Sequence, residues 1–230
     1  MERLLLACAT PRECRPLLEN LSPVPLGGRQ AYVLSPAALL LVCGVGKVNC
    51  AQALTAALET AGPFSALISF GAAGAFPSSG LAPGDLAVAS EEFSDEVVVL
   101  PERLVSPAEI GLPLESRFPA DPELTVRLLS ACRRAALPGR RTASGPFLTV
   151  SRITSSRAEA QRLEQLFGPL LCESMEGAAA AQVARHYGLP FAELRAVSNL
   201  VDDRDRQRWD WELAERACCL AVSTLLEGPS

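Results

Sequence analysis

Glu176 stands at a position where a carboxylate could either support a helix or serve a binding site. It lies in "CESMEGAAAAQVA" (172–184), directly before Gly177 and four alanines. Gly188 and Pro190 follow the alanine stretch, as is usual after a helix C-terminus. We therefore expect Glu176 in or just before the first helical turn. Its charge could complement the helix dipole, which is worth ~0.3–1 kcal/mol, or it could face a ligand.

A second set of polar residues occurs on a segment that is otherwise buried in character. The stretch "LPFAELRAVSNLV" (189–201) predicts a strand that carries Glu193, Arg195 and Asn199. Buried charges need partners or a function. Carboxylates, an arginine and an amide that converge at strand ends would form a polar site inside an apolar pocket.

Two glycine-containing segments could bring backbone close to a ligand. "CGVGK" (43–47) lacks the spacing of a phosphate-binding loop, and it lacks the third glycine of a dinucleotide fingerprint. Gly46 is therefore expected either in a structural turn or beside a ligand. "FGAAGAF" (70–76) places Ala72 and Gly74 at the C-terminal end of a strand, where ligands tend to bind in α/β sheets.

The composition excludes several classes of function. The chain has 230 residues and a net charge of −5, so no basic surface points to a nucleic-acid partner. No apolar run reaches the ~18 residues of a membrane span. The eight cysteines form no C-x-x-C pair and there is one histidine, so neither a metal site nor a cofactor is expected. Unpaired cysteines in apolar runs fit a reducing cytoplasm.

Strands that alternate with helices predict an α/β fold, with three α/β/α layers around a central mixed sheet, in a single domain over 1–230. The segment 101–123 is rich in proline and serine and is expected to be a long loop, which could act as a lid. Strands are expected at 3–9, 29–36, 38–46, 65–76, 84–93, 143–154 and 189–201, and helices within 10–21 and at 49–62, 122–137, 155–168, 177–187 and 210–228.

Four of these segments, in the same order, resemble the nucleoside phosphorylase and nucleosidase superfamily. They are "CGVGKVN", "SFGAAGAF", "SMEGAA" and "LPFAELRAVSN". Nucleosidases of this superfamily that act on methylthioadenosine and S-adenosylhomocysteine have an aspartate where this chain has Asn199. The extension "SNLVDDRDRQRW" (198–209) is similar to futalosine hydrolases, which belong to an alternative bacterial route to menaquinone.

The resemblance implies roles for individual residues in cleaving an N-ribosidic bond. Glu13, in "ATPREC", would activate water as the general base, and Arg195 would orient the water and Glu13. Glu176 would accept hydrogen bonds from the ribose 2′- and 3′-hydroxyls, and Met175 would pack against the sugar. The remaining substrate-binding residues implied by the resemblance are Gly46, Ala72, Gly74 and Ser198.

Asn199 is expected to set the preference for the base. An asparagine releases no proton, but its NH₂ group can donate to N7 and O6 of a 6-oxopurine such as hypoxanthine. Whether Phe147 or Ile153 stacks on the purine is left open by the sequence.

Arg204 and Arg206 follow two aspartates. One of them could bind the benzoate carboxylate of futalosine, or both could belong to a solvated charge run.

Three functions remain open at this point. No arginine lies between Arg29 and Arg103, which favours hydrolysis over phosphorolysis because phosphate binding needs a fork of donors. A nucleoside-binding module without activity is the third possibility. The alanine-rich helices at 49–61 and 177–187 could support a homo-oligomer, as in relatives, or pack into the core.

Overall fold

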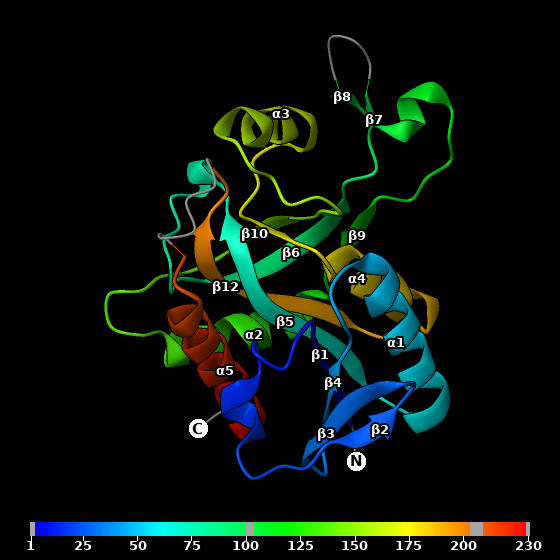
Figure 1. The fold of residues 1–230 in the computed structure, drawn as a ribbon, viewed down its shortest axis with the longest axis vertical. Helices are drawn as coiled ribbons and strands as arrows, with labels where there is room; N and C mark the ends of the chain where they lie inside the picture. Colours follow the sequence, from blue (N-terminus) through cyan, green and yellow to red (C-terminus); the bar gives the residue numbers. More distant parts are fainter. Residues whose placement is uncertain (1–2, 100–103, 203–208, 229–230) are drawn as a thin grey trace.

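The computed structural model describes residues 3–99, 104–202 and 209–228. Within these ranges the chain forms a ten-stranded mixed sheet in the order β11-β10-β6-β12-β5-β1-β4-β3-β2, with β9 paired to β6. Helices cover both faces of this sheet (Figure 1). The α/β fold with a mixed central sheet is therefore confirmed.

The central strands are apolar and parallel. β1 (Leu4–Cys8) pairs in parallel with β4 (Ala38–Val42) and with β5 (Ala66–Ala75), and β5 pairs in parallel with β12 (Phe191–Leu200). Such strands are covered on both faces, which explains their near-continuous runs of Leu, Ile, Val and Ala. The carboxyl ends of these neighbouring strands lie at one edge of the sheet.

Beyond β12 the sheet closes on itself. β6 (Leu86–Ser94) pairs with β12, β10 (Thr142–Thr149) pairs with β6, and β11 (Cys172–Ser174) pairs with both β10 and β5. The three residues of β11 thus complete a ring of strands. The sequence did not lead us to expect β11, because it is too short to show a periodic pattern.

The opposite edge is built by antiparallel pairing. β3 (Arg29–Ser35) pairs with β4, and β2 (Val24–Leu26) pairs with β3 through a turn at residues 27–28. We did not expect β2 either, since its three residues include a proline. Proline is tolerated there because β2 is the edge strand.

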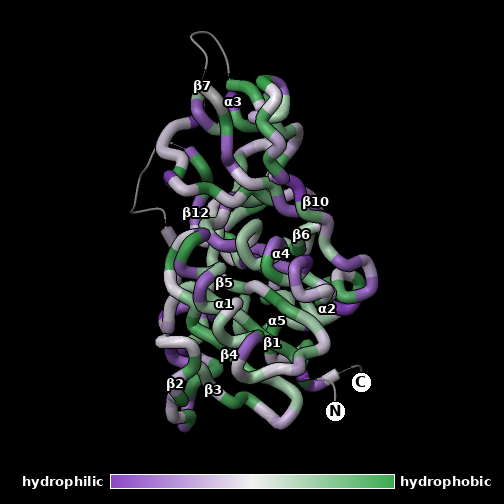
Figure 2. The backbone as a smooth tube through the Cα atoms, turned by 90° about the vertical axis from the view of Figure 1, so that its right-hand side faces the viewer, coloured by the Kyte–Doolittle hydropathy of each residue, from purple (hydrophilic) through white to green (hydrophobic). Residues whose placement is uncertain are grey.

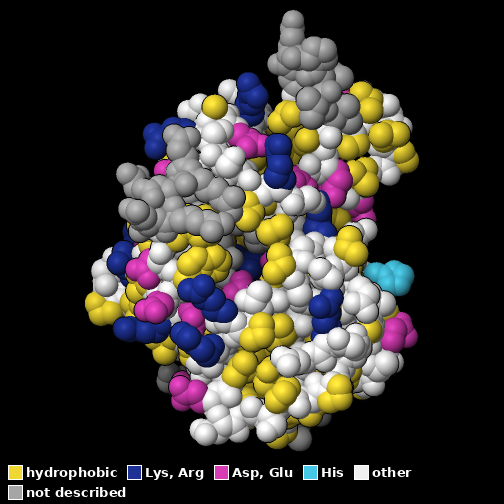
Figure 3. All heavy atoms as spheres, in the orientation of Figure 1, with side chains coloured by type: hydrophobic (Ala, Val, Ile, Leu, Met, Phe, Trp, Pro, Cys, Tyr) yellow, Lys and Arg dark blue, Asp and Glu magenta, His cyan; other side chains and the backbone are white. Residues whose placement is uncertain are grey.

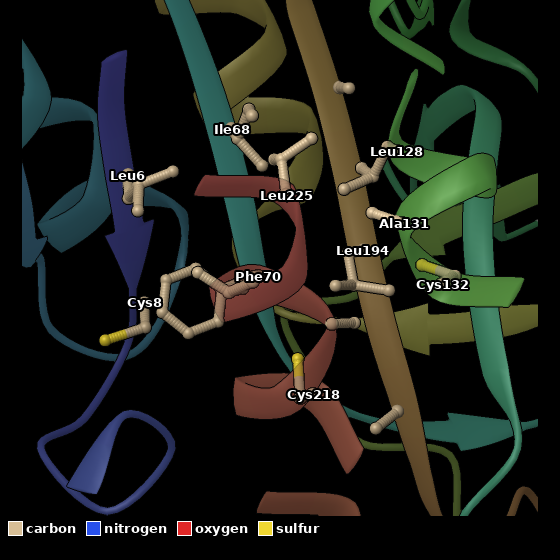
Figure 4. Close-up of a cluster of buried hydrophobic side chains, with 14 of the residues drawn as sticks. Leu6, Cys8, Ile68, Phe70, Leu128, Ala131, Cys132, Leu194, Cys218 and Leu225 are labelled. Carbon is tan, nitrogen blue, oxygen red and sulfur yellow. The ribbon is translucent and has the colours of Figure 1, made fainter. Parts of the chain in front are cut away.

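Two pairs of helices form the outer layers. α2 (Pro122–Ala135) packs against α5 (Trp211–Glu227), and α1 (Lys47–Ala61) packs against α4 (Gly177–His186) on the other face. Figure 4 shows part of the core between the sheet and the first pair of helices. Phe70 and Leu194 come from the sheet, and Cys218 comes from α5. The alanines of α4 are buried against α1 and the sheet, so their small size serves close helix packing.

The segment 101–123 contains more structure than the expected loop. Its described part holds β8 (Leu104–Val105), which pairs with β7 (Val98–Val99), then η3 (Pro107–Ile110) and β9 (Arg117–Pro119). β9 pairs with β6 and buries Phe118. The expectation of a long structureless loop is therefore wrong. Val105, Pro107 and Phe118 are all buried, so the segment is packed at several points.

The remaining elements are short or peripheral. α3 (Arg157–Phe167) lies beside β8 at one end of the molecule (Figure 1), and two single turns occur at η1 (Arg15–Leu18) and η2 (Pro77–Ser79). The helix expected within 10–21 is a single turn that begins at Arg15, so Glu13 precedes it.

Hydrophobic and charged residues are distributed as in an ordinary globular protein. Along the backbone, hydrophobic stretches gather on the inner strands and helices (Figure 2). Basic and acidic side chains are interspersed on the face shown in Figure 3. Among the described residues, no helix is both long and apolar enough to cross a membrane.

Candidate active site

Seven of the predicted catalytic and ribose- or base-binding residues, apart from the stacking candidates, line one cavity. They come from distant parts of the chain. The two acids Glu13 and Glu176 are both in its wall, although 163 positions separate them in the sequence. The other predicted residues in the wall are Ala72, Gly74, Met175, Ser198 and Asn199. The cavity therefore brings an acid from the β1 end, small residues from β5 and polar groups from β12 to one place.

Both oxygens of the Glu13 carboxylate are held by neighbouring donors. The backbone N–H and the hydroxyl of Thr10 donate to Oε2, at 2.9 Å and 3.2 Å. The backbone N–H of Ala72 donates to Oε1 at 3.1 Å. Glu13 is 8% exposed. A turn after β1 and the end of β5 thus fix the direction of this carboxylate before any ligand binds.

Glu176 is fixed by the start of a helix other than its own. It occupies the N-cap position of α4 but makes no side-chain cap there. Its Oε1 instead accepts a hydrogen bond of 2.8 Å from the backbone N–H of Gly46, directly before α1. Burial raises the pKa of Glu176, against the opposing effects of Arg195 and the Gly46 N–H. Gly46 therefore positions Glu176, and it lines a neighbouring cavity rather than this one.

Arg195 lies beneath the cavity and links the two acids. Its Nη1 is 3.9 Å from Glu13 Oε1, and its Nη2 is 3.6 Å from Glu176 Oε2. The residue is 1% exposed, and Nε donates to Glu193 Oε1 at 2.6 Å. Burial works against the charge, but Glu193 and then the other two carboxylates raise the pKa of Arg195. The Arg195 guanidinium thus lies within 4 Å of both cavity acids.

Behind Arg195 lies a second pair of acids. Glu193 and Glu92 are both 0% exposed, and the hydroxyl of Thr149 donates to Glu92 Oε2 at 2.7 Å. Burial and the adjacent Glu193 raise the pKa of Glu92 well above its usual range. Glu92 therefore shares this buried space with Glu193. No pattern in the sequence pointed to Glu92, which occurs in "SEEF" on a strand with both polar and apolar neighbours.

The strand β5 leaves room for Glu13 and Arg195 by having no side chain at Gly71. A Cβ atom at this position would lie 2.4 Å from Glu13 Oε1 and 2.6 Å from Arg195 Nη1. Real side chains do not approach this closely, so the glycine of "FGAAGAF" is required by the acid–arginine contact. The sequence identified this segment as a place of close approach but did not identify Gly71 as the critical position.

A bulge places Ser198 and Asn199 at the other end of the cavity. The pairing of β12 with β5 shifts register between Val197 and Asn199, and such bulges redirect side chains. The Ser198 hydroxyl donates to Asn199 Oδ1 at 2.8 Å, and Asn199 Nδ2 donates to the Leu200 carbonyl at 3.0 Å. An amide NH₂ carries two N–H groups, so the side chain keeps a second donor.

Apolar and aromatic residues form the remaining wall, and sequence reasoning located only some of them. Ile153 lines the cavity, whereas Phe147 is fully buried in the core next to it. Trp209 and Trp211 also line the cavity, with their ring centroids 5.7 Å apart, and the Arg12 guanidinium lies 5.1 Å from the Trp211 ring centroid. Trp211 was missed because it begins a helix of otherwise ordinary composition. The wall also includes Val150 and Glu173, which we did not anticipate.

Two predicted contacts cannot be placed. Arg204 and Arg206 lie outside the described residues. Lys47, the single lysine, contacts Ser94, Asp95 and Glu96 beside the neighbouring cavity.

Comparison with known proteins gives this architecture a family. A family model described as the phosphorylase superfamily matches residues 3–227. The chain is 36% identical over 194 residues to a futalosine hydrolase of Thermus thermophilus, which covers 81% of this chain and 80% of that protein. It is 29% identical over 190 residues to a 5′-methylthioadenosine/S-adenosylhomocysteine nucleosidase of Halalkalibacterium halodurans, with 82% and 78% covered.

Solved structures have the same fold. A 5′-methylthioadenosine/S-adenosylhomocysteine nucleosidase from Neisseria meningitidis, in complex with methylthio-immucillin-A, matches with a TM-score of 0.86 and 23% identity over all of both chains. The futalosine hydrolase of Helicobacter pylori matches with a TM-score of 0.83 and 18% identity over 99% of this chain and 98% of that one. The chain therefore belongs to the phosphorylase superfamily, and within it to the nucleoside N-glycosidases of the methylthioadenosine nucleosidase and futalosine hydrolase family.

Proposed function

We propose that the protein hydrolyses the N-ribosidic bond of futalosine, releasing hypoxanthine and dehypoxanthine futalosine for menaquinone synthesis. The observation that carries this proposal is the position of Asn199 in the same cavity as Glu13 and Glu176. The two acids suit a sugar and its attacking water, and the amide suits a 6-oxopurine. The 36% identity to a futalosine hydrolase points the same way.

The chemistry follows from how the side chains are held. Bond cleavage gives the sugar an oxocarbenium character, and the Glu13 and Glu176 carboxylates offset its positive charge. Glu13 takes a proton from the attacking water, and Arg195 orients the water and Glu13. Glu176 accepts hydrogen bonds from the ribose diol, which are strong because the acceptor is charged. Met175 packs on the sugar, with Ala72, Gly74 and Ser198 around it.

The charge around Glu13 favours water over phosphate. The Arg195 guanidinium lies within 4 Å of Glu13, Glu176 and Glu193, so its charge is already shared among three carboxylates. A phosphate dianion at this position would meet a net negative field. Lys47 is held by two carboxylates elsewhere. The reaction is therefore a hydrolysis rather than a phosphorolysis.

A product assay tests the proposal. Pure protein is incubated with futalosine, aminofutalosine, inosine or methylthioadenosine, with and without phosphate, and the released purine and any ribose 1-phosphate are identified by chromatography. We expect hypoxanthine from futalosine at a rate that phosphate does not change. Faster release of adenine from methylthioadenosine would instead favour a methylthioadenosine/S-adenosylhomocysteine nucleosidase, and phosphate-dependent turnover would favour a phosphorylase.

Replacing Asn199 by aspartate is expected to shift the preference from 6-oxopurine to 6-aminopurine substrates. An aspartic acid can give a proton to N7 and accept a hydrogen bond from the exocyclic amine, which an amide serves poorly. The measurement is the ratio of kcat/KM for inosine to that for adenosine, which we expect to fall by about tenfold or more. Unchanged relative rates would mean that Asn199 does not determine which base is recognised.

Arg204→Ala and Arg206→Ala are expected to differ from each other and to affect futalosine much more than inosine. A guanidinium fork pairs well with the benzoate carboxylate that inosine lacks. The measurement is KM for both substrates, and we expect one variant to raise it by about tenfold for futalosine alone. Equal effects on both substrates would place these residues in a charge run without substrate contact.

The cellular setting is part of the same proposal. All eight cysteines are unpaired and buried, which fits a reducing cytoplasm. We also propose that the protein is a homo-oligomer, because Val48 at the start of α1 is 83% exposed beside Leu114 and the neighbouring cavity. Light scattering of the pure protein measures the assembly directly, and a monomer at micromolar concentration would contradict this part.

A further inference from the structure

The proposed function leaves one chemical requirement without a residue. When the C1′–N9 bond breaks, its electron pair goes to the purine, and a proton on the purine makes this departure easier. Asn199 can donate a hydrogen bond but cannot release a proton. Three carboxyl groups line the cavity within the described residues, and Glu13 and Glu176 are engaged with water and sugar. The third is Glu173.

Glu173 lies next to Asn199 at the purine end of the cavity. In β11 it is paired with Gly74 of β5. A Cβ atom added to Gly74 would lie 3.2 Å from Asn199 Nδ2 and 3.6 Å from Glu173 Cγ. Both side chains therefore lie close to this glycine, and they come from strands on either side of β5.

The surroundings of Glu173 are those of an acid kept ready to give a proton. The residue is 6% exposed, and its Oε1 accepts a hydrogen bond of 3.1 Å from the Thr154 N–H. Its Oε2 is buried and has no hydrogen-bond partner in the part of the chain that the structure describes. A buried carboxylate oxygen without a partner is costly, whereas the protonated carboxyl carries no charge. Burial raises the pKa of Glu173 to about 7, so the protonated form is present at neutral pH.

We propose that Glu173 is the general acid that protonates the departing purine. This rests on the proposed nucleosidase function and deepens it. As the C1′–N9 bond breaks, the carboxyl proton of Glu173 passes to N7 of the purine, while the free N–H of Asn199 donates to O6, and Glu173 is left as a carboxylate. Water forms the new C1′–O bond and gives its proton to Glu13. A proton then returns from Glu13 to Glu173 through solvent, so that both residues begin the next cycle unchanged.

The test compares two leaving groups in Glu173→Gln. Glutamine preserves size and accepts the Thr154 hydrogen bond, but it has no proton to give. With a purine nucleoside that the wild type cleaves, we expect kcat to fall by roughly 100-fold or more. With p-nitrophenyl β-D-ribofuranoside, whose nitrophenolate leaves without a proton, we expect nearly the wild-type rate. Glu215→Gln is the matched control, because Glu215 is a buried glutamate with an unpartnered Oε2 outside this cavity. Any change in its rate should be the same for both substrates.

The wild-type pH profile gives a second readout that needs no variant. An acid must be protonated to act, so kcat for the purine substrate should fall as the pH rises through about 7, the pKa of Glu173. The p-nitrophenyl substrate should lack this descending limb.

Equal losses on both substrates, no loss on either, or the same limb in both profiles would overturn the role of Glu173. Failure of futalosine as a substrate would overturn only the proposed function, because any purine nucleoside that is cleaved serves in this test.

Discussion

Turnover is expected to fall by about 10²–10⁴-fold when Glu13 is replaced by glutamine, while nucleoside affinity largely survives. The carboxylate is the group that takes the proton of the attacking water, and an amide cannot take it. Binding depends mainly on Glu176, Asn199 and the cavity walls, which the substitution leaves in place. The measurements are single-turnover rates with futalosine and calorimetric binding of 9-deazainosine, whose C-glycosidic bond resists hydrolysis.

The structure indicates a small cost that must be separated from the catalytic effect. Both Glu13 oxygens accept hydrogen bonds from backbone N–H groups, of Thr10 and Ala72. The NH₂ of glutamine would face one of these donors, which costs about 1–3 kcal/mol of stability. Thermal unfolding of Glu13→Gln reports this cost. Glu19→Gln is the control, because Glu19 is exposed and lies in the same segment.

Two outcomes would contradict the assignment. Wild-type-like turnover in Glu13→Gln would mean that another group activates the water. If the wild type binds 9-deazainosine but cleaves no nucleoside, and Glu13→Gln binds equally well, the protein is a nucleoside-binding module without activity.

Much of the site could be predicted because its residues occur in contiguous motifs on regular elements. Glu176 precedes an obvious helix, and Arg195 and Asn199 share one strand, so their types and spacing were visible locally. Charged residues in an apolar strand indicated that a site was present. The role of Glu13, in contrast, came from the resemblance to a family. Its segment "ATPREC" carries no pattern that separates it from an ordinary turn.

The residues that were missed depend on contacts between distant segments. Glu92 lies in the buried acid pair because β6 lies next to β12. Glu173 lines the cavity because β11 closes the ring of strands against β5. A three-residue strand has no periodicity, and nothing local distinguishes a buried glutamate from an exposed one in "CES". Ring closure is a long-range pairing, and patterns in one sequence do not report it.

The largest effect on stability is expected for Arg195→Met. Arg195 is 1% exposed, and Glu193, Glu176 and Glu13 lie within 4 Å of its guanidinium. Removing one partner of a buried charge pair leaves uncompensated charge, which costs about 3–5 kcal/mol. Chemical denaturation measures this loss. Arg117→Met is the control, because Arg117 pairs with Glu91 at the surface and should contribute little.

The deficit of Arg195→Met should shrink as the pH falls, and the sign follows from the carboxyl groups. Arg195 lowers the pKa of Glu176 and Glu92, against the burial that raises both. Without it, both pKa values in the folded state rise further above the unfolded value of about 4.3. A carboxyl group whose pKa is higher in the folded state adds to stability at low pH. This contribution is lost as the pH rises through the folded-state pKa. We therefore expect a smaller deficit at pH ~5 than at pH ~8.

A second substitution separates charge from packing. Glu193 Oε1 is 2.6 Å from Arg195 Nε, so Arg195→Met with Glu193→Gln removes the cation together with its nearest anion. If uncompensated charge causes the loss, the double variant recovers part of the stability at pH ~8. The difference between its stabilities at pH ~5 and pH ~8 is then smaller than in Arg195→Met. If the loss comes from packing, the double variant is no more stable than Arg195→Met at either pH. Activity should fall in both variants, because neither holds a cation between Glu13 and Glu176.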